Sequence, residues 1–199
     1  LQAQDLKFPA NPIAPVLIAP NIGSYVGGDI TAGTLASGIW DCDSLSLFID
    51  LGTNGEIVFG NRDFLVSCAC SAGPAFEGGD ISCGMRATDG AIEACTIDKV
   101  TMKPTVSIVG DAEQKAVGIC GSGIIDIISE LYRCGIINAK GLFVREGERI
   151  RRDHHGMGRY VIAFENESET GREVSINEVD IDNFIRAKGA IFSAIATLL

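Results

Sequence analysis

Several features that define other classes of protein are missing from this sequence. No apolar run approaches the ~18 residues that a membrane-spanning helix needs, and no secretory signal pattern is visible. Basic residues are fewer than acidic ones: the sequence contains 16 Lys and Arg and 26 Asp and Glu, which gives a formal net charge of −10. That charge repels the phosphates of nucleic acids and anionic membranes, so we expect neither as a partner.

Paired cysteine motifs are missing as well. The cysteines number seven, and no two of them form a C-x-x-C pair. This pattern argues against a disulfide framework and against a zinc ribbon. Cys68 and Cys70 fall on one side of a predicted strand. We expect them to be small core side chains in a reducing compartment, which indicates the cytoplasm; a metal-ligand role is the alternative.

What the sequence does contain is enough apolar material for a substantial core. The chain has 199 residues, of which 46% are hydrophobic and 21% are charged, so global disorder is not expected. It starts without Met, and an apolar helical pattern runs to Leu199 without a stop signal. We therefore expect this chain to be a piece of a longer protein.

The most informative stretch begins with the apolar segment Leu45–Ile49. Such a segment predicts a strand that is covered on both faces, and Asp50 ends it. Asn54-Gly55 predicts a two-residue hairpin turn, with a return strand at Glu56–Phe59. A third strand is expected at Phe64–Cys70.

The turn Gly52-Thr53-Asn54-Gly55 has the composition of an anion-binding site. Glycine lets backbone N–H groups converge on a phosphate, and Thr53 and Asn54 add side-chain donors. Asp50 would repel a phosphate, but it can hold a hydrated Mg²⁺ that bridges to the phosphates. The stretch therefore predicts half of a magnesium–nucleotide site. An ordinary hairpin with a solvated Asp50 is the alternative.

A glycine-rich loop precedes the first predicted helix, Ile30–Ile39. Asp29 is expected to be its N-cap, and a direct role of Asp29 at a ligand site is the alternative. Strands are expected at Ala91–Ile97, Thr105–Val109 and Tyr160–Phe164.

Two further helices are predicted from apolar periodicity. The first lies within Gly118–Gly135, with Ser122 as N-cap and Gly135 just past its end. Its GICGSG entry could also offer N–H groups to an anion. The second helix runs from Asp180 to the end of the chain, after a capping-box pattern formed by Ser175 and Glu178.

Five blocks of this sequence together resemble the reductive activators of corrinoid proteins. The blocks are APNIGSYVGGD, FIDLGTNGEIVFGN, SCACSAGPAFEGGDISCGMRATDGAIE, GICGSGIIDIISEL and IDNFIRAKGAIF. These activators are iron–sulfur ATPases that look like members of the actin, sugar-kinase and chaperone-ATPase superfamily. The resemblance covers the chain from Asn11 onward.

The resemblance implies an α/β fold. It is RNase-H-like (actin-like ATPase), with a mixed sheet flanked by helices, and this chain would hold an incomplete second half. Residues 1–44 would form a lead-in strand, glycine-rich loop and helix, and residues 45–199 the ATPase subdomain, truncated at its C-terminus. Asp50, Gly52, Thr53, Asn54 and Gly55 resemble the phosphate turn of that half, with Asp50 as the metal-binding residue, and Asp29 would lie near the nucleotide cleft.

The function implied by the resemblance is the return of an oxidised corrinoid cobalt to its active state, as needed for methyl transfer in anaerobic metabolism. ATP and Mg²⁺ would be the cofactors, a corrinoid protein the partner, and an iron–sulfur cluster would lie in a missing N-terminal part. No second acid-Gly-Thr turn and no Gly-Gly adenosine loop are found here. The chain alone is therefore expected to be inactive, and no catalytic residue is identified. A docking module for a corrinoid protein and a small-molecule kinase of the same superfamily are the alternatives.

Overall fold

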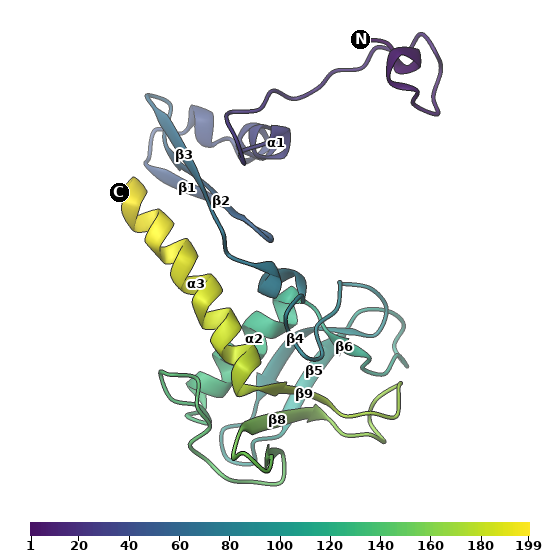
Figure 1. The fold of residues 1–199 in the computed structure, drawn as a ribbon, viewed down its shortest axis with the longest axis vertical. Coiled ribbons are helices and arrows are strands. Elements are labelled where there is room, and N and C mark those ends of the chain that lie inside the picture. The colour runs from purple at the N-terminus through teal and green to yellow at the C-terminus, as the bar shows by residue number, and fades with distance from the viewer. The chain divides into compact units, whose positions relative to one another are not determined.

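The structure, a computed structural model, describes all residues from Leu1 to Leu199 (Figure 1). The chain divides into two compact units. The first contains Leu1–Asp50, Glu56–Ala69 and Thr197–Leu199, and the second contains Leu51–Gly55 and Cys70–Ala196. None of the helices combines the length and the apolar character that a bilayer crossing requires.

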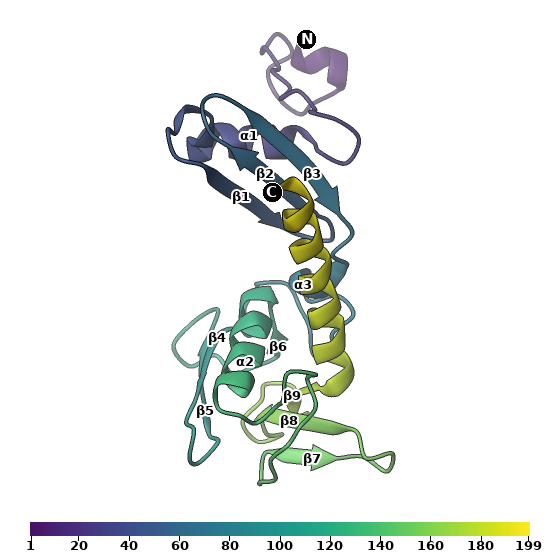
Figure 2. The same ribbon diagram turned by 90° about the vertical axis from the view of Figure 1, so that its left-hand side faces the viewer.

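The first unit is built around one small sheet. Its strands lie in the order β1-β2-β3, and one α-helix and two short 3₁₀ helices accompany them (Figure 2). The bounds are η1 Ala3–Leu6, α1 Gly28–Ser37, η2 Ile39–Asp41, β1 Ser46–Leu51, β2 Gly55–Gly60 and β3 Leu65–Cys70. The three predicted strands are thus confirmed, whereas the α-helix begins earlier than expected.

The core of the first unit lies between α1 and the sheet. Val26, Ile30 and Val58 are buried together, and Phe48 packs against them. A Cβ added to Gly33 would lie 2.6 Å from the Phe48 ring, so glycine is what allows the helix to approach β1 this closely.

The prediction that β1 is covered on both faces is wrong. Leu47 and Ile49 are 41% and 37% exposed, whereas Phe48, on the opposite face, is half-buried. The reason is that α1 covers only the face on which Phe48 lies, and alternation along the strand places Leu47 and Ile49 on the other face.

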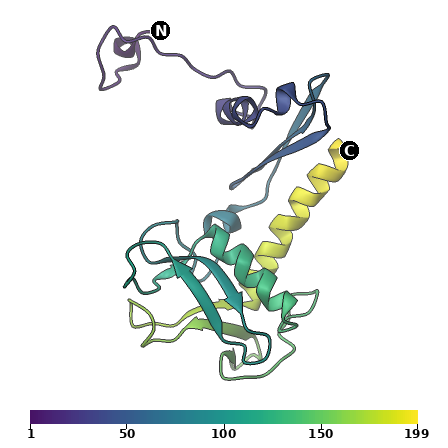
Figure 3. The ribbon, with the colours of Figure 1, turned by 180° about the vertical axis from the view of Figure 1, so that it is seen from behind.

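The second unit contains two further three-stranded sheets and two long helices (Figure 3). The elements are η3 Pro74–Glu77, β4 Ala91–Ile97, β5 Pro104–Ile108, β6 Gly118–Ile119, α2 Gly121–Arg133, β7 Ile150–Arg152, β8 Gly158–Ala163, β9 Val174–Asn177 and α3 Glu178–Leu198. The sheet orders are β5-β4-β6 and β7-β8-β9. Strand β4 pairs antiparallel with β5 and parallel with β6, so this sheet is mixed, as the α/β prediction required.

The core of the second unit forms where α2 packs on β4. Ile124, Ile127 and Leu131 recur at helical spacing on α2 and are completely buried. Tyr160 of β8 is also completely buried, and its hydroxyl donates a hydrogen bond of 2.8 Å to the Met102 carbonyl. Burial without that acceptor would be costly, so the bond fixes where β8 meets the loop before β5.

Both predicted helix caps in this unit are wrong by a few residues. Cys120, and not Ser122, is the N-cap of α2. At α3 the reciprocal bonds are made by Asn177 and Asp180: Asn177 Oδ1 accepts the Asp180 N–H at 3.0 Å, and Asp180 Oδ2 accepts the Asn177 N–H at 3.0 Å. Ser175 lies inside β9 instead, so the capping box is real but begins two residues later.

Candidate functional site

The candidate phosphate turn joins β1 to β2. Gly52, Thr53 and Asn54 form the connection, and the Gly52 N–H donates to the Asn54 carbonyl at 3.0 Å. Neither Asn54 nor Gly55 has a positive φ, and Gly55 already belongs to β2. The prediction of a two-residue Asn-Gly turn is therefore wrong, because the primed turns that such a pair forms require positive φ.

The last residue of β3 and the segment that follows it hold this turn in place. The Gly73 N–H donates to the Thr53 carbonyl at 2.9 Å, and the Thr53 hydroxyl donates to Glu77 Oε2 at 2.6 Å. The Cys70 thiol donates to the Gly55 carbonyl at 3.3 Å. All of these residues belong to the second unit, so the conformation of the turn is fixed within that unit.

The turn leaves several hydrogen-bond donors without an acceptor. The backbone N–H groups of Thr53 and Asn54 donate to no acceptor in the chain. Thr53 is exposed and Asn54 is half-buried. Two adjacent free amides in an exposed turn are the donors that a phosphate oxygen requires.

The two glycines of the turn have different roles. A Cβ on Gly52 would lie 3.2 Å from Glu77 Oε1, so this carboxylate approaches the turn closely. Gly55 is buried, and a Cβ there would meet Cys70 Sγ at 2.9 Å and Ile191 at 3.0 Å. Glycine at position 52 therefore leaves room for the Glu77 carboxylate, whereas glycine at position 55 allows close packing against Cys70 and Ile191.

The acidic residues predicted for the site lie in the first unit. Asp50 is exposed near the end of β1, and Asp29 is exposed in the first turn of α1. The N-cap is Gly27, so the prediction that Asp29 caps the helix is wrong. Asp29 Oδ1 instead accepts the N–H of Ile30 at 2.9 Å.

The negative charges of Asp50 and Asp29 affect the ionisation of a third carboxyl group, that of Glu56. Burial, and then the negative charges of Asp50 and Asp29, raise the pKa of the half-buried Glu56 carboxyl. No group of three or more His, Cys, Asp or Glu side chains is arranged to enclose a metal ion. Mg²⁺ commonly keeps several waters and takes only one or two carboxylates, and Asp50 fits that form of binding.

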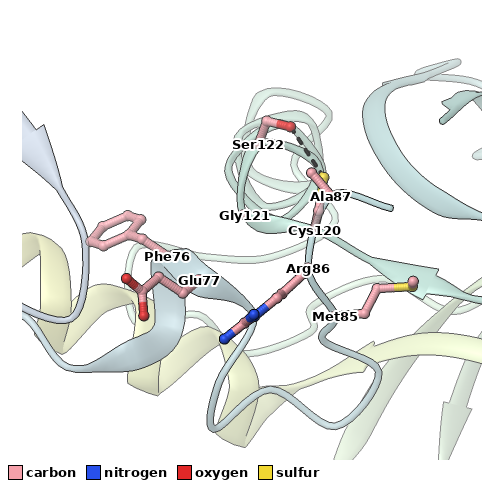
Figure 4. A pocket seen from close by; sticks show the side chains of 8 residues that line it. All are labelled: Phe76, Glu77, Met85, Arg86, Ala87, Cys120, Gly121 and Ser122. Atoms are coloured by element: carbon pink, nitrogen blue, oxygen red, sulfur yellow. Dashed lines mark hydrogen bonds between the residues drawn. The ribbon is translucent and has the colours of Figure 1, made fainter. Parts of the chain in front are cut away.

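A cavity of about 430 Å³ lies beside Glu77 in the second unit (Figure 4). The end of η3, the loop after it and the start of α2 form its walls. The lining residues are Phe76, Glu77, Met85, Arg86, Ala87, Cys120, Gly121 and Ser122. The guanidinium of the exposed Arg86 makes no hydrogen bond or ion pair within the chain, and Figure 4 shows its side chain extended from the loop that also carries Met85.

The glycines of the GICGSG segment bring α2 into contact with its neighbours. A Cβ on Gly121 would lie 1.8 Å from the Phe76 carbonyl oxygen, and one on Gly123 would lie 2.1 Å from the Ile92 carbonyl oxygen. These glycines are therefore required for close backbone packing of α2 on η3 and β4. The cavity and the contact of Glu77 with the turn were not predicted from sequence.

Comparison with protein families identifies this architecture. Residues 44–199 match the family described as the C-terminal domain of RACo, the ASKHA domain, and residues 1–41 match the RACo middle region. A solved structure, described as a reductive activator for corrinoid, iron-sulfur protein, superposes with a TM-score of 0.90 at 49% identity. The match covers 100% of this chain and 32% of that one.

Two curated relatives agree with this result. The corrinoid activation enzyme RamQ of Eubacterium limosum is 36% identical over 100% of this chain, and the match covers 34% of RamQ. A [Co(II) methylated amine-specific corrinoid protein] reductase of Methanosarcina barkeri is 26% identical over 92% of this chain and 34% of its own length. The chain thus spans about a third of these relatives. By fold and by sequence, the chain belongs to the RACo family and carries its C-terminal, actin-like ASKHA domain.

Proposed function

We propose that the turn Gly52–Gly55 binds the phosphates of ATP, and that Asp50 orients a hydrated Mg²⁺ beside it. The observation that carries this proposal is the pair of free N–H groups of Thr53 and Asn54 in an exposed turn. Membership of an ASKHA family supports a nucleotide as the source of the phosphates. Asp29 is proposed as a further acid near the nucleotide.

Each residue of the proposed site has a separate task. The amides of Thr53 and Asn54 donate to phosphate oxygens, and the Asn54 amide side chain, which has no partner in the chain, adds a donor. Glycine at position 52 leaves the approach open. The Asp50 carboxylate would hold a hydrated Mg²⁺ through its waters, and the metal would neutralise part of the phosphate charge.

The whole protein is proposed to be an ATP-dependent reductive activator of a corrinoid protein. The relatives are described as corrinoid activators or reductases, and this chain spans about a third of their length. Returning an electron to an oxidised cobalt would then require an iron–sulfur cluster outside this chain, with ATP offsetting the unfavourable potential. We propose a cytoplasmic location, and domain limits at 1–44 and 45–199.

The test is Asp50→Asn in the full-length protein, which removes one charge and keeps the size of the side chain. We expect ATP-dependent reduction of the corrinoid protein to fall at least about tenfold, with an unchanged circular dichroism spectrum. Asp63→Asn is the matched control, because Asp63 is an exposed acid in the turn between β2 and β3. Full ATP-dependent activity of the Asp50→Asn variant would refute the proposal.

A further inference from the structure

The contact between Thr53 and Glu77 has a consequence for phosphate binding. We infer that Glu77 is an internal anion that competes with the nucleotide phosphate for the turn and so limits nucleotide affinity. The inference rests on the proposed function of the turn, and it adds Glu77 as a residue that determines the affinity and selectivity of the turn for phosphate.

Thr53 has a single hydroxyl proton to donate. It is donated to Glu77 Oε2 at 2.6 Å, a length typical of a hydrogen bond to a charged oxygen. A phosphate oxygen bound by the Thr53 and Asn54 amides would also be an anionic acceptor for the same proton. Glu77 Oε1 lies 3.2 Å from the position of a Cβ on Gly52, so both carboxylate oxygens lie against the turn. A phosphate seated on the turn would therefore meet a like charge.

The backbone of Glu77 is fixed, so the carboxylate would have to leave by side-chain rotation. The Gly78 N–H donates to the Ala75 carbonyl at 3.2 Å, and the Gly79 N–H donates to the Pro74 carbonyl at 2.8 Å. These bonds close the 3₁₀ turn that carries Glu77 at its end.

The cavity beside η3 offers the displaced carboxylate a partner. Glu77 and Arg86 line the same cavity (Figure 4), and the Arg86 guanidinium has no hydrogen-bond or ion-pair partner within the chain. A carboxylate that turns away from Thr53 can thus approach an unpaired guanidinium, for which a bidentate pair is the favoured geometry. Rotation of the Glu77 side chain would remove its repulsion of the phosphate at the turn and add an attraction to Arg86 across the cavity.

The experiment compares nucleotide binding by the full-length protein and by its Glu77→Gln variant. Glutamine keeps an oxygen that accepts the Thr53 hydroxyl, so the variant isolates the charge of residue 77. We expect Glu77→Gln to bind ATP about fivefold more tightly at low ionic strength, in EDTA and with Mg²⁺, because two like charges about 4 Å apart in water repel by about 1 kcal/mol and salt screens this repulsion. Adenosine, which has no phosphate, should bind equally to both proteins.

The control is Glu113→Gln, which makes the same change of net charge on an exposed loop of the second unit. It should leave ATP affinity within about twofold. A second variant, Glu77→Ala, removes the carboxylate entirely and should also tighten ATP binding, with an unchanged thermal midpoint as the check on folding.

Three results would overturn the inference, and they can be told apart. Unchanged ATP affinity of Glu77→Gln, while the wild type binds ATP, would show that Glu77 does not compete. Weaker binding confined to Mg²⁺ conditions would make Glu77 a partner of the metal instead. Absence of ATP binding by the wild type would refute the proposed function itself, and the inference with it.

Discussion

The substitution Asp180→Ala should destabilise the second unit strongly. Asp180 lies at the start of α3 and is only 2% exposed. Its Oδ1 accepts the Ser82 N–H at 2.8 Å and the Ser82 hydroxyl at 3.0 Å, and its Oδ2 accepts the Asn177 N–H at 3.0 Å. One carboxylate therefore ties the loop around Ser82 to the first turn of α3.

The magnitude follows from the groups that the substitution leaves without a partner. Removal of the carboxylate leaves the two backbone N–H groups of Ser82 and Asn177 without this acceptor, at about 1–3 kcal/mol each. Because Ser82 is exposed and water can reach its N–H, we expect the lower part of that range, a loss of about 2–3 kcal/mol in the free energy of unfolding.

The assay is urea unfolding of the full-length protein, followed by hydrogen exchange of the α2 amides, which report on the second unit. Asp182→Ala is the matched control. Asp182 pairs with Arg186 at 2.7 Å on the exposed face of α3, and such a pair contributes about 0.5 kcal/mol or less. A loss below about 1 kcal/mol for Asp180→Ala would show that the carboxylate does not hold the loop as described.

Substitutions of Gly121 and Glu130 test the packing and the electrostatics of α2, and a substitution of Gly189 in α3 is the packing control. Gly121→Ala should cost about 2 kcal/mol or more in thermal unfolding, because its Cβ would lie 1.8 Å from a carbonyl oxygen of η3. Gly189→Ala, with open space around it on α3, should be neutral or stabilising. Two hydrogen bonds to the Glu130 carboxylate lower its pKa. The first comes from the Arg133 guanidinium, and the second from the Ile97 N–H at 2.7 Å. Because the pKa of Glu130 is lowered in the folded state, its carboxylate stabilises the folded protein at pH values above the unfolded pKa of about 4.3. Glu130→Gln should therefore lower the free energy of unfolding by about 1 kcal/mol at pH 7, as measured by urea unfolding. That cost should vanish as the pH falls through the folded pKa, and a pH-independent cost would contradict the assignment.

Local patterns in the sequence predicted the strongest elements well. The predicted strand Ala91–Ile97 has the bounds of β4, and the helices predicted near Gly118–Gly135 and from Asp180 onward are α2 and α3. The reason is that apolar periodicity records which face of an element is buried. Gly135, with φ of 65°, follows α2 as expected for a helix that ends in the left-handed conformation.

Long-range contacts could not be predicted in the same way. Thr53 and Glu77 are 24 residues apart, and Ser82 and Asp180 are 98 apart, so no local pattern links them. The cap errors have a related cause, because Asp29 and Ser122 both suit a cap chemically. Their neighbours Gly27 and Cys120 take that position because tertiary packing sets where each helix begins.

Calorimetric titration of Mg·ATP into the full-length protein tests the central claim most directly, with the wild type compared with Asp50→Ala. The account predicts saturable binding to the wild type and loss of that binding in the variant, with both proteins folded. Equal binding by the two proteins, or no binding by the wild type, would contradict the assignment of this turn as a nucleotide phosphate site.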